Sequence, residues 1–549
     1  MLTEQTELTE QTDGHYVNSN AIGRIKVPKS AEVSDLYLRC NEFVSITYQE
    51  DNTKVRLRQG GIISSNSYFS SFYEIFYTKY TSLKSFFYVL QLEGDFKVSI
   101  NREFSTKNSR EVIFEEEFKD CKFLEPVKTP PIDLLQNENA GRIYIEVLCL
   151  SEEGSFGQGL LLTDESKVRE VNLGIIICTF KKEAYVKNTV AAILQDSLLQ
   201  NKSFNVFIVD NGRTLEPEQF IHPKFTLVSN INAGGSGGFT RGLVEALDQN
   251  TYSHFLLMDD DIKLESESIY RLISLYEYAT SEFAVAGALL DLNNQHMLYE
   301  AGALYNEGSK TRGFGPGALT ALNYNVDLRT TKGLNHLLPK EDADYGGFWC
   351  FCFSKEIIEK SKLPLPLFIK IDDVEFGLRI RKDLKIPIVA FPAIAVWHQP
   401  ASAKNLNWET YYYARNDLIA YTIHFSLGYM EVVSHFTKVI IQSLLQSNYD
   451  QAQMYIKAYE DYLQGSDFIK NSDPEVFHPN LIKLSRTYEN QTAVSQLDRI
   501  KLLTRWLKIA AKGRTQWSSV SQEWKEAAPE MISTQFWRRY LRLKDSKIS

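Results

Sequence analysis

Apolar runs and helical patterns alternate between residues 174 and 258, and this alternation constrains the fold more than any other feature of the chain. The apolar runs cover 174–180, 204–210, 226–228 and 255–258, with helical patterns at 184–199 and from about 240 to 249 between them. Uninterrupted apolar runs are typical of strands that are buried on both faces of a parallel sheet. This order predicts an α/β domain with a doubly wound, mainly parallel sheet, which we assign to residues 171–405.

The segments that flank this domain have different patterns. Residues 20–165 contain short stretches rich in aromatic and β-branched residues, separated by turn residues, and they predict an antiparallel β-sandwich domain. Residues 406–500 have helical periodicity and predict a helical domain. The polar and acidic residues 1–19 are expected to be a disordered segment, and residues 501–549 a basic amphipathic helical tail.

Composition excludes several classes of protein. Hydrophobic residues make up 44% of the 549 residues and charged residues 23%, which is enough apolar material for folded domains. The net charge of −9 argues against nucleic acid as a partner. The chain begins with a polar stretch where a signal peptide would be apolar, and no window has 18 uncharged apolar residues, so we expect a cytoplasmic protein without a membrane span. Six sparse cysteines without a CxxC pair support neither a zinc site nor a redox pair.

Polar residues follow the apolar strands of the central domain, at the point where each strand ends. They are Thr179, Asp210, Asn232 and Asp259. Because ligands of open α/β sheets bind beyond the carboxyl ends of the strands, we expect these residues to meet in one crevice. The glycines in 232–238 would let the backbone approach a phosphate or a sugar, with a flexible loop as the alternative. They fit neither a dinucleotide fingerprint nor a P-loop.

Three aspartates, Asp259, Asp260 and Asp261, directly follow the last of these strands. Adjacent carboxylates repel one another unless a cation compensates their charge. Carboxylate oxygens are ligands that Mg²⁺ and Mn²⁺ prefer, and such an ion can bridge a diphosphate. The run therefore predicts a metal and diphosphate site, with a solvated acidic turn or a helix cap as the structural alternative.

A second pair of acids, Asp372 and Asp373, precedes a helical pattern. A carboxylate at such a place acts as a general base when a substrate hydroxyl lies within hydrogen-bonding reach, whereas acidic capping of the helix is the structural alternative. His398 ends another apolar strand. It becomes a third metal ligand if the fold brings it to Asp259 and Asp261, and otherwise it is a structural histidine.

Two aromatic residues, Phe348 and Trp349, follow a glycine pair at 346–347, and Tyr345 precedes it. Sugar rings stack on aromatic faces through their apolar C–H groups, and the hydroxyl of Tyr345 could add a hydrogen bond. The alternative is a buried core strand, since aromatic side chains are often buried.

Taken in chain order, these motifs resemble family 2 of the inverting glycosyltransferases, which have the GT-A fold and use nucleotide-sugar donors. The β-rich segment in front and the helices behind are similar to the polymerising galactofuranosyltransferases of that family. The resemblance covers about residues 20–465. The matching positions are Cys178–Phe180, Val209–Gly212, Asn232 with its glycines, Asp259–Asp261, Asp372–Asp373 and Trp397–His398.

The resemblance implies a role for each candidate residue. Mn²⁺ or Mg²⁺ would be held by Asp259, Asp261 and His398 against the diphosphate of a UDP-sugar. The catalytic base that deprotonates the acceptor hydroxyl would be Asp373. The donor site would comprise Thr179, Phe180, Asp210 (against uracil), Asn232, Gly234 and Asp260, and the acceptor site would comprise Asp372, Trp349, Tyr345, Glu300 and His296.

The chain departs from these enzymes where the acceptor would bind. Phe348 and Trp349 stand in place of paired tryptophans, and Ile371 replaces another tryptophan. The resemblance implies UDP-galactofuranose as donor and a glycan or lipid-linked glycan as acceptor, while a rhamnose or pyranose donor stays open. A non-catalytic glycan-binding protein, and a nucleotidyltransferase or phosphodiesterase with two close metal ions, also stay open.

The tail, 501–549, predicts a surface contact. It holds 11 Lys+Arg, four Asp+Glu and four of the seven tryptophans. Trp506 and Trp537 each lie on an apolar helical face bordered by Lys and Arg, a pattern typical of helices that bind anionic membranes. We therefore expect peripheral attachment to the inner face of the cell membrane. The alternative is a helix that packs within the protein or in a homo-oligomer.

Overall fold

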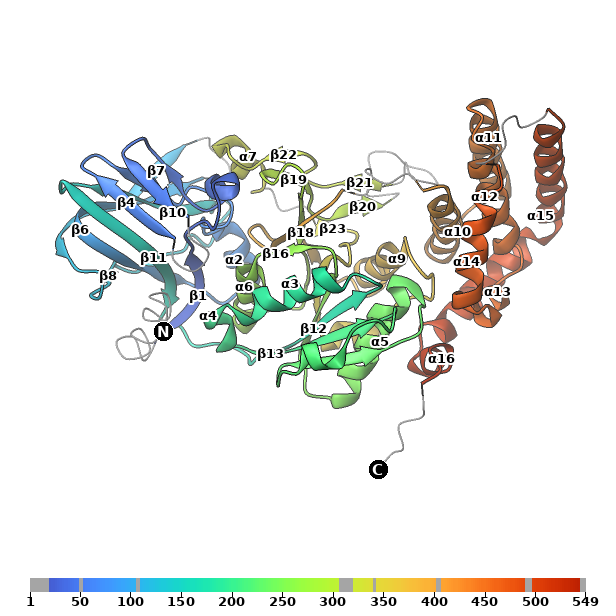
Figure 1. Cartoon of the computed structure of the whole chain (residues 1–549), viewed down its shortest axis with the longest axis horizontal. Coiled ribbons are helices and arrows are strands. Elements are labelled where there is room, and N and C mark those ends of the chain that lie inside the picture. The colour runs from blue at the N-terminus through green and yellow to red at the C-terminus, as the bar shows by residue number, and fades with distance from the viewer. Residues whose placement is uncertain are drawn as a thin grey trace.

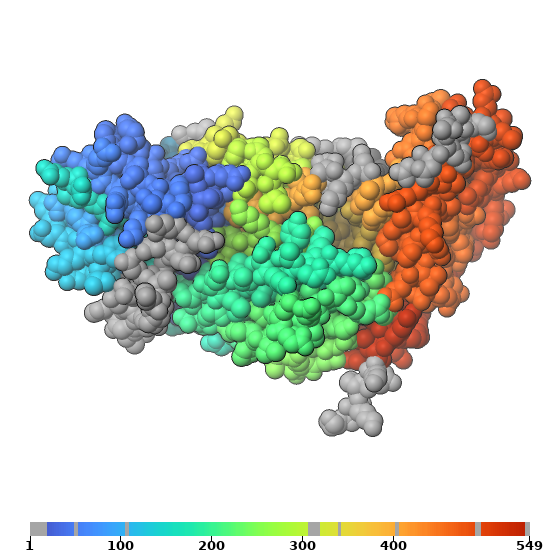
Figure 2. All heavy atoms as spheres, in the orientation of Figure 1, coloured from blue at the N-terminus to red at the C-terminus, as the bar shows by residue number. Residues whose placement is uncertain are grey.

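The computed structural model describes residues 19–48, 53–104, 109–305, 319–338, 342–400, 406–488 and 496–543. Three parts follow one another along the long axis: a β-rich part (blue to cyan), an α/β part (green to yellow) and a helical part (orange to red) (Figure 1). The space-filling view shows the helical part standing against the end of the α/β part (Figure 2). The segment predicted to be disordered lies outside the described residues, apart from Ser19.

The β-rich part contains an 11-stranded sheet whose described pairings are all antiparallel. Its longest strand, β6 (Ser85–Glu103), pairs with β11 over its first half and with β10 over its second half, so it joins two sections of sheet. Gly94 separates the halves with φ at +113°, a conformation that favours glycine. This arrangement is consistent with the predicted β-sandwich. The other strands are β1 (Asn20–Ile25), β2 (Arg39–Cys40), β3 (Val44–Thr47), β4 (Lys54–Arg58), β5 (Ile62–Ser64), β7 (Arg110–Cys121), β8 (Val127–Lys128), β9 (Ile132–Asp133), β10 (Arg142–Cys149) and β11 (Glu153–Thr163), with helix α2 (Glu74–Tyr80) between β5 and β6.

The α/β part is built on an eight-stranded sheet with the order β14-β13-β12-β15-β24-β17-β25-β23. The first four strands of this order are parallel and correspond to the four predicted apolar runs. The next strand, β24, is antiparallel to both of its neighbours, so the sheet is parallel in one half and mixed in the other. The strands are β12 (Asn172–Thr179), β13 (Ser203–Asp210), β14 (Phe225–Ser229), β15 (His254–Asp259), β17 (Ala284–Ala286), β23 (Asp342–Ala343), β24 (Cys350–Ser354) and β25 (Ile388–Val389).

A five-stranded sheet with the order β16-β26-β18-β19-β22 lies beside the large one. It aligns segments that are far apart in the sequence, because β26 pairs with both β16 and β18. The strands are β16 (Lys263–Leu264), β18 (Ala288–Asp291), β19 (Met297–Glu300), β22 (Val326–Asp327) and β26 (Ala395–His398), while β20 (Ala303–Tyr305) and β21 (Leu319–Ala321) form a separate pair. The helices of this part are α3 (Glu183–Leu194), α4 (Ser197–Gln200), α5 (Gly234–Gln249), α6 (Ser266–Glu277), α7 (Thr331–His336), α8 (Lys355–Ser361) and α9 (Asp372–Leu378).

The helical part consists of α10 (Asn407–His424), α11 (Tyr429–Leu445), α12 (Tyr449–Tyr462), α13 (Asp467–Asn471), α14 (Pro474–Leu484), α15 (Gln496–Met531) and α16 (Thr534–Tyr540). The predicted helical domain therefore continues into the tail, since α15 packs against α10, α11 and α12. In the part of the chain that the structure describes, no helix combines the length and the apolar composition needed to cross a bilayer.

The tryptophans of the tail are buried, which corrects the expectation that their helical faces meet a membrane. Trp506, Trp517, Trp524 and Trp537 are each less than 8% exposed. Every indole N–H donates within the protein; that of Trp506 bonds to Thr437 at 2.9 Å, and that of Trp537 bonds to the carbonyl of Pro364 at 2.8 Å. These faces therefore pack in the core, which is the alternative that the helical pattern had left open.

Candidate active site

The acidic run is positioned by two sheets. Asp259 is the last residue of β15, and β16 follows two residues after Asp261. Because β16 pairs with β26, the end of β26 carries His398 back to the acids. The imidazole Nε2 of His398 lies 3.0 Å from Oδ1 of Asp261. The fold thus joins residues that are 137 positions apart in the sequence.

Asp259, Asp261 and His398 could hold a metal ion. Each offers one ligand atom, and these atoms lie within 4.8 Å of one another. Burial raises the pKa of Asp259 to about 6; His398 opposes this shift, and the neighbouring carboxylates of Asp261 and Asp260 add to it. A cation among these groups would relieve that repulsion, and two carboxylates with an imidazole form a donor set that Mn²⁺ accepts. The chemistry of the cluster therefore fits the predicted ion.

Lys182 is a residue of this cluster that the sequence reasoning missed. Its ammonium lies 2.6 Å from Oδ2 of Asp261 and 3.3 Å from Oδ1 of Asp260. Although burial opposes it, the hydrogen bonds from His398 and Lys182 hold the pKa of Asp261 below its ordinary value. Lys182 follows β12 by three residues, so its place beyond a strand end was the available signal.

The second acid pair begins helix α9, and its two carboxylates face different groups. Asp372 is buried, and its pKa is raised well above the ordinary value by burial, then by Asp373 and, more weakly, by Asp259. Burial raises the pKa of Asp373 to about 6, against the opposing effects of the Val374 N–H, which donates at 2.8 Å, and of Lys370. The charge of Asp259 therefore acts on Asp372, whereas the charge that acts on Asp373 is that of Lys370.

Both acid clusters line one cavity of about 560 Å³. Helix α10 of the helical part closes it with Glu409 and Tyr413. Phe348 and Ile371, the positions where the chain departs from the resembling enzymes, also lie in the wall. Of the predicted site residues, nine line this cavity: Asp259, Asp260, Asp261, Glu300, Tyr345, Trp349, Asp372, Asp373 and His398.

Glu300 and Tyr345 lie near Asp373 in the wall of the cavity. Burial raises the pKa of Glu300 to about 8, with a further contribution from the charge of Asp373 and an opposing one from a Tyr345 hydrogen bond. Oε1 of Glu300 is buried without a hydrogen-bond partner among the described residues. Glu300 is therefore largely protonated at neutral pH and can donate a hydrogen bond to a ligand.

Trp349 reaches the cavity because Gly347, two residues before it, has no side chain. A Cβ on Gly347 would lie 2.2 Å from the Trp349 ring. The indole N–H of Trp349 donates to the carbonyl of Gly287 at 3.2 Å, which fixes the ring. The glycine pair therefore serves close packing of the ring rather than flexibility.

The glycine-rich stretch also serves packing, and the alternative of a flexible loop is wrong because the stretch is largely helical. Helix α5 starts at Gly234, well before the predicted start near residue 240. A Cβ on Gly234 would lie 2.1 Å from the carbonyl oxygen of Phe368, and one on Gly238 would lie 2.1 Å from Sγ of Cys178. The glycines therefore let α5 approach β12 and the 368–371 loop closely. Within the run, Gly235 lines the cavity.

Five of the six predicted donor-site residues lie outside the cavity wall: Thr179, Phe180, Asp210, Asn232 and Gly234. The carboxylate of Asp210 is buried and accepts the backbone N–H groups of Gly212, Thr214 and Leu215 at 2.7–2.9 Å, so it shapes its own loop. Asn232 accepts the N–H of Gly234 at 3.2 Å in the same manner. Thr179 is buried, at 1% exposure.

Phe180 and His296 complete the predicted set. Phe180 is 45% exposed beside the cluster, and its N–H donates to Asp260 at 3.3 Å, so its ring is open to a stacking ligand. His296 does not line the cavity, which contradicts its expected place there. It lies near Asp327 of β22, whose pKa is lowered by Arg329 and, more weakly, by His296.

Comparison with known proteins shows which family this sheet and this site resemble. Residues 171–412 match the model of the family described as "Glycosyltransferase like family 2". The central part of the chain is thus similar to family 2 glycosyltransferases, and the match supports a glycosyl transfer function.

Curated relatives extend the similarity beyond this domain. The chain is 26% identical to galactofuranosyltransferase GlfT2 of Mycobacterium tuberculosis over 82% of this chain and 73% of the relative. It is 28% identical to GlfT2 of Mycolicibacterium smegmatis over 61% of this chain and 54% of that relative. The predicted resemblance to the galactofuranosyltransferases is therefore confirmed.

Solved structures superpose on this chain only with low TM-scores. A mannosyltransferase from Pyrobaculum calidifontis, solved with GDP-Man and Mn²⁺, has a TM-score of 0.31 at 12% identity and covers 67% of this chain and 88% of its own. Residues 1–349 of S. aureus TarS give 0.33 at 12% identity, over 63% of this chain and 91% of that one. These scores are too low to support an argument about ligands.

Proposed function

We propose that this protein is an inverting, metal-dependent glycosyltransferase. It transfers a sugar, galactofuranose from UDP-galactofuranose, to a hydroxyl group of a glycan or lipid-linked glycan. The observation that carries the proposal is the division of one cavity between two acid clusters: the Asp259, Asp261 and His398 group and the Asp373 side with Glu300. An inverting transfer needs charge neutralisation at the leaving group on one side and a base on the other.

The residues divide the work between donor and acceptor. Asp259, Asp261 and His398 would hold Mn²⁺ or Mg²⁺, which neutralises the charge of the departing UDP when it is bound. Lys182 adds a positive charge beside them, and the exposed ring of Phe180 is available for stacking with the uracil of UDP. Asp373 accepts the proton of the acceptor hydroxyl as that oxygen attacks the anomeric carbon. Glu300, which is protonated at neutral pH, donates a hydrogen bond to the acceptor.

The donor sugar and the acceptor rest on the curated relatives, whose name is galactofuranosyltransferase. The test is a panel of UDP- and dTDP-sugars with Mn²⁺ and short galactofuranose acceptors, reading nucleotide release and product mass. We expect transfer from UDP-galactofuranose alone, and none after chelation of the metal. Transfer from a rhamnose or pyranose donor would overturn the donor assignment. Glycan binding without any nucleotide release would support a non-catalytic protein.

Peripheral membrane attachment stays part of the proposal, on a different surface from the one first expected. The outer side of α15 exposes Leu497, Ile500 and Leu507, each by more than half. Lys501 and Lys508 are exposed next to them in the sequence. An exposed apolar and basic surface suits an anionic lipid headgroup region, and a lipid-linked acceptor would bring the enzyme there.

The pH dependence of transfer should be bell-shaped. Asp373 must be ionised to act as a base, and its pKa is raised from 3.8 to about 6, so kcat/KM should rise with pH through about 6. Glu300 must be protonated to donate, and its pKa is raised to about 8, so kcat/KM should fall through about 8. Initial rates from pH 4.5 to 9.5 at saturating Mn²⁺ test this. A profile that is flat from pH 5 to 9 would contradict both assignments.

Replacing Glu300 should separate its hydrogen bond from its charge. Because neutral glutamic acid and glutamine both donate a hydrogen bond, Glu300→Gln should keep kcat/KM within about threefold of the wild type at pH 7. The decrease in kcat/KM as pH rises through about 8 should be absent in this variant. Glu300→Ala should lower kcat/KM by about 10- to 100-fold, the cost of a lost buried hydrogen bond. If the alanine variant is as active as the glutamine variant, Glu300 does not contact the acceptor.

A further inference from the structure

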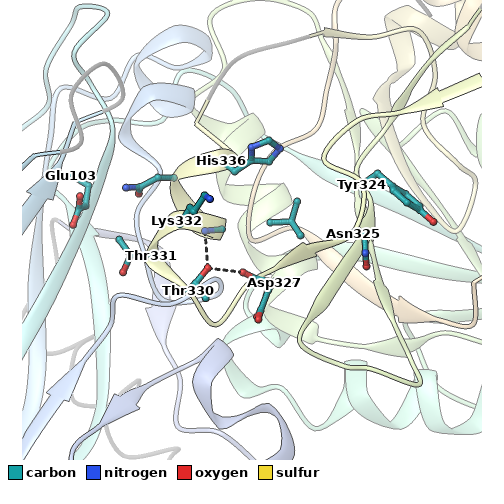
Figure 3. Close-up of a pocket in the computed structure, with 11 residues that line it drawn as sticks. Glu103, Tyr324, Asn325, Asp327, Thr330, Thr331, Lys332 and His336 are labelled. Atoms are coloured by element: carbon teal, nitrogen blue, oxygen red, sulfur yellow. Dashed lines mark hydrogen bonds between the residues drawn. The ribbon is translucent and has the colours of Figure 1, made fainter. Parts of the chain in front are cut away.

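A second cavity, of about 870 Å³, lies between the β-rich part and the α/β part. One wall is Glu103, the last residue of β6, and the other is formed by α7, by β22 and by the turn before β22 (Figure 3). We call this cavity the outer groove. The proposed reaction uses none of the residues that line it.

The lining of the outer groove suits a ligand that has many hydroxyl groups. Glu103 and Asp327 offer carboxylate acceptors, Asn325 and Asn335 offer amides that both donate and accept, and Lys332 donates. Tyr324 presents an aromatic ring that is 60% exposed, on which the C–H face of a sugar can stack. Acceptors, donors and one open ring are together what an uncharged sugar chain requires.

The burial of Glu103 indicates that this carboxylate binds a ligand. It is only 7% exposed, yet it takes part in no ion pair among the residues that the structure describes. The hydroxyl of Tyr144 donates to its Oε1 at 3.3 Å, which is a long hydrogen bond for a carboxylate. Among the described residues Tyr144 is the one hydrogen-bond donor to Glu103, and Arg110 and Arg142 act on it through charge alone, so the carboxylate retains the capacity to accept hydrogen bonds from a ligand in the groove.

The wall opposite Glu103 is held in place by the protein. Arg142 donates to the side-chain oxygen of Asn335 at 3.1 Å, and Arg39 donates to the hydroxyl of Thr331 at 3.2 Å. Thr330 caps α7 by accepting the N–H of Gly333 at 2.9 Å and donates to the carbonyl of Asp327 (Figure 3). The groove is therefore preformed, and a ligand would not bear the cost of ordering it.

A pair of aromatic rings in contact lies between the outer groove and the catalytic cavity. Tyr299 lines the catalytic cavity, Tyr324 lines the groove, and their ring centroids are 5.3 Å apart in an edge arrangement. They lie at paired strands, since β19, which carries Tyr299 and Glu300, pairs with β22. Neighbouring strands are about 5 Å apart, so the two cavities border each other at this pair of rings.

We propose that the outer groove is a remote subsite that binds the non-reacting sugars of a long, uncharged glycan acceptor. The proposal rests on the proposed function, because it takes the end of that glycan to lie at Asp373. Binding energy from the remote sugars would hold the reactive hydroxyl in place. A phosphate is disfavoured by the two carboxylates in the lining, and a lone divalent cation by Lys332 and by the arginines behind α7.

The test measures binding without transfer. The full chain, without donor, is titrated by ligand-observed NMR with galactofuranose oligosaccharides of two and of six units. We expect the hexasaccharide to bind at least tenfold more tightly than the disaccharide, and Tyr324→Ala to bring this ratio below about threefold, the loss of one stacking contact. Phe43→Ala, a change of an exposed ring that lines neither cavity, should keep the ratio.

The outcomes separate this inference from the proposed function. Equal ratios in the wild type and in Tyr324→Ala, or equal affinities for the two oligosaccharides, would overturn the groove while leaving transfer to a disaccharide untouched. A lower ratio of hexasaccharide to disaccharide affinity in Glu103→Gln would support the groove as a sugar-binding site. The donor panel has a different readout, which is nucleotide release with the disaccharide. If it failed, a measured dependence of affinity on oligosaccharide length would still hold.

Discussion

Replacing Asp373 with asparagine should lower sugar transfer by about 10²- to 10⁴-fold and leave the affinity for UDP with Mn²⁺ unchanged. Asparagine keeps the size of the side chain and can still accept the N–H of Val374, but its amide cannot take up a proton at neutral pH. Asp373 does not belong to the candidate ligand group of Asp259, Asp261 and His398, so the metal cluster should be unaffected. The measurement is single-turnover transfer together with UDP titration.

A matched change on the same stretch controls for disturbance of α9. Asp383 is an exposed aspartate shortly after this helix, and Asp383→Asn should transfer at the wild-type rate. If Asp373→Asn turns over normally, the base is another residue. If it loses UDP binding as well, Asp373 belongs to the donor side and the division of the cavity is wrong.

The sequence predicted the parallel half of the sheet well, because buried parallel strands leave an uninterrupted apolar run. It predicted the mixed half less well, because β17 and β25 are only three and two residues long and carry little periodicity. The acidic run alone predicted a metal site, but the meeting of Asp261 with His398 was predictable only through resemblance. Asp261 and His398 meet through the pairing of β16 with β26, and each strand end alone has a structural alternative.

The glycine run and Asp210 illustrate what the sequence could not distinguish. Glycines permit a close approach, but the approaching group is known only from the fold, and here it is Cys178 for Gly238 and Phe368 for Gly234. An aspartate at a strand end binds a ligand or its own loop with the same chemistry, and Asp210 binds its own loop. In α15 the amphipathic pattern gave the buried face correctly but not the partner, which is the helical part.

Removing the side-chain charge of Arg24 should destabilise the contact between the β-rich and α/β parts by about 3–5 kcal/mol. Arg24, on β1, is 8% exposed and pairs with Asp196 and Glu267, each at 2.6 Å. Asp196 caps α4 and Glu267 lies on α6, so Arg24→Met would leave one buried carboxylate without its ion-pair partner and the other with Arg271 alone. Chemical denaturation should show an earlier first transition, because a chain with several parts need not unfold in one step.

The loss should depend on pH in a defined direction. Although burial opposes it, Arg24 and Lys26 hold the pKa of Asp196 below its ordinary value of 3.8. A depressed carboxyl pKa stabilises the fold above the unfolded value and ceases to do so as pH falls through the folded value. The difference between wild type and Arg24→Met should therefore be full at pH 7 and shrink below about pH 4. Lys122→Met removes an exposed pair with Glu125 and should cost at most about 1 kcal/mol. If the two variants unfold alike, the buried network does not hold the parts together.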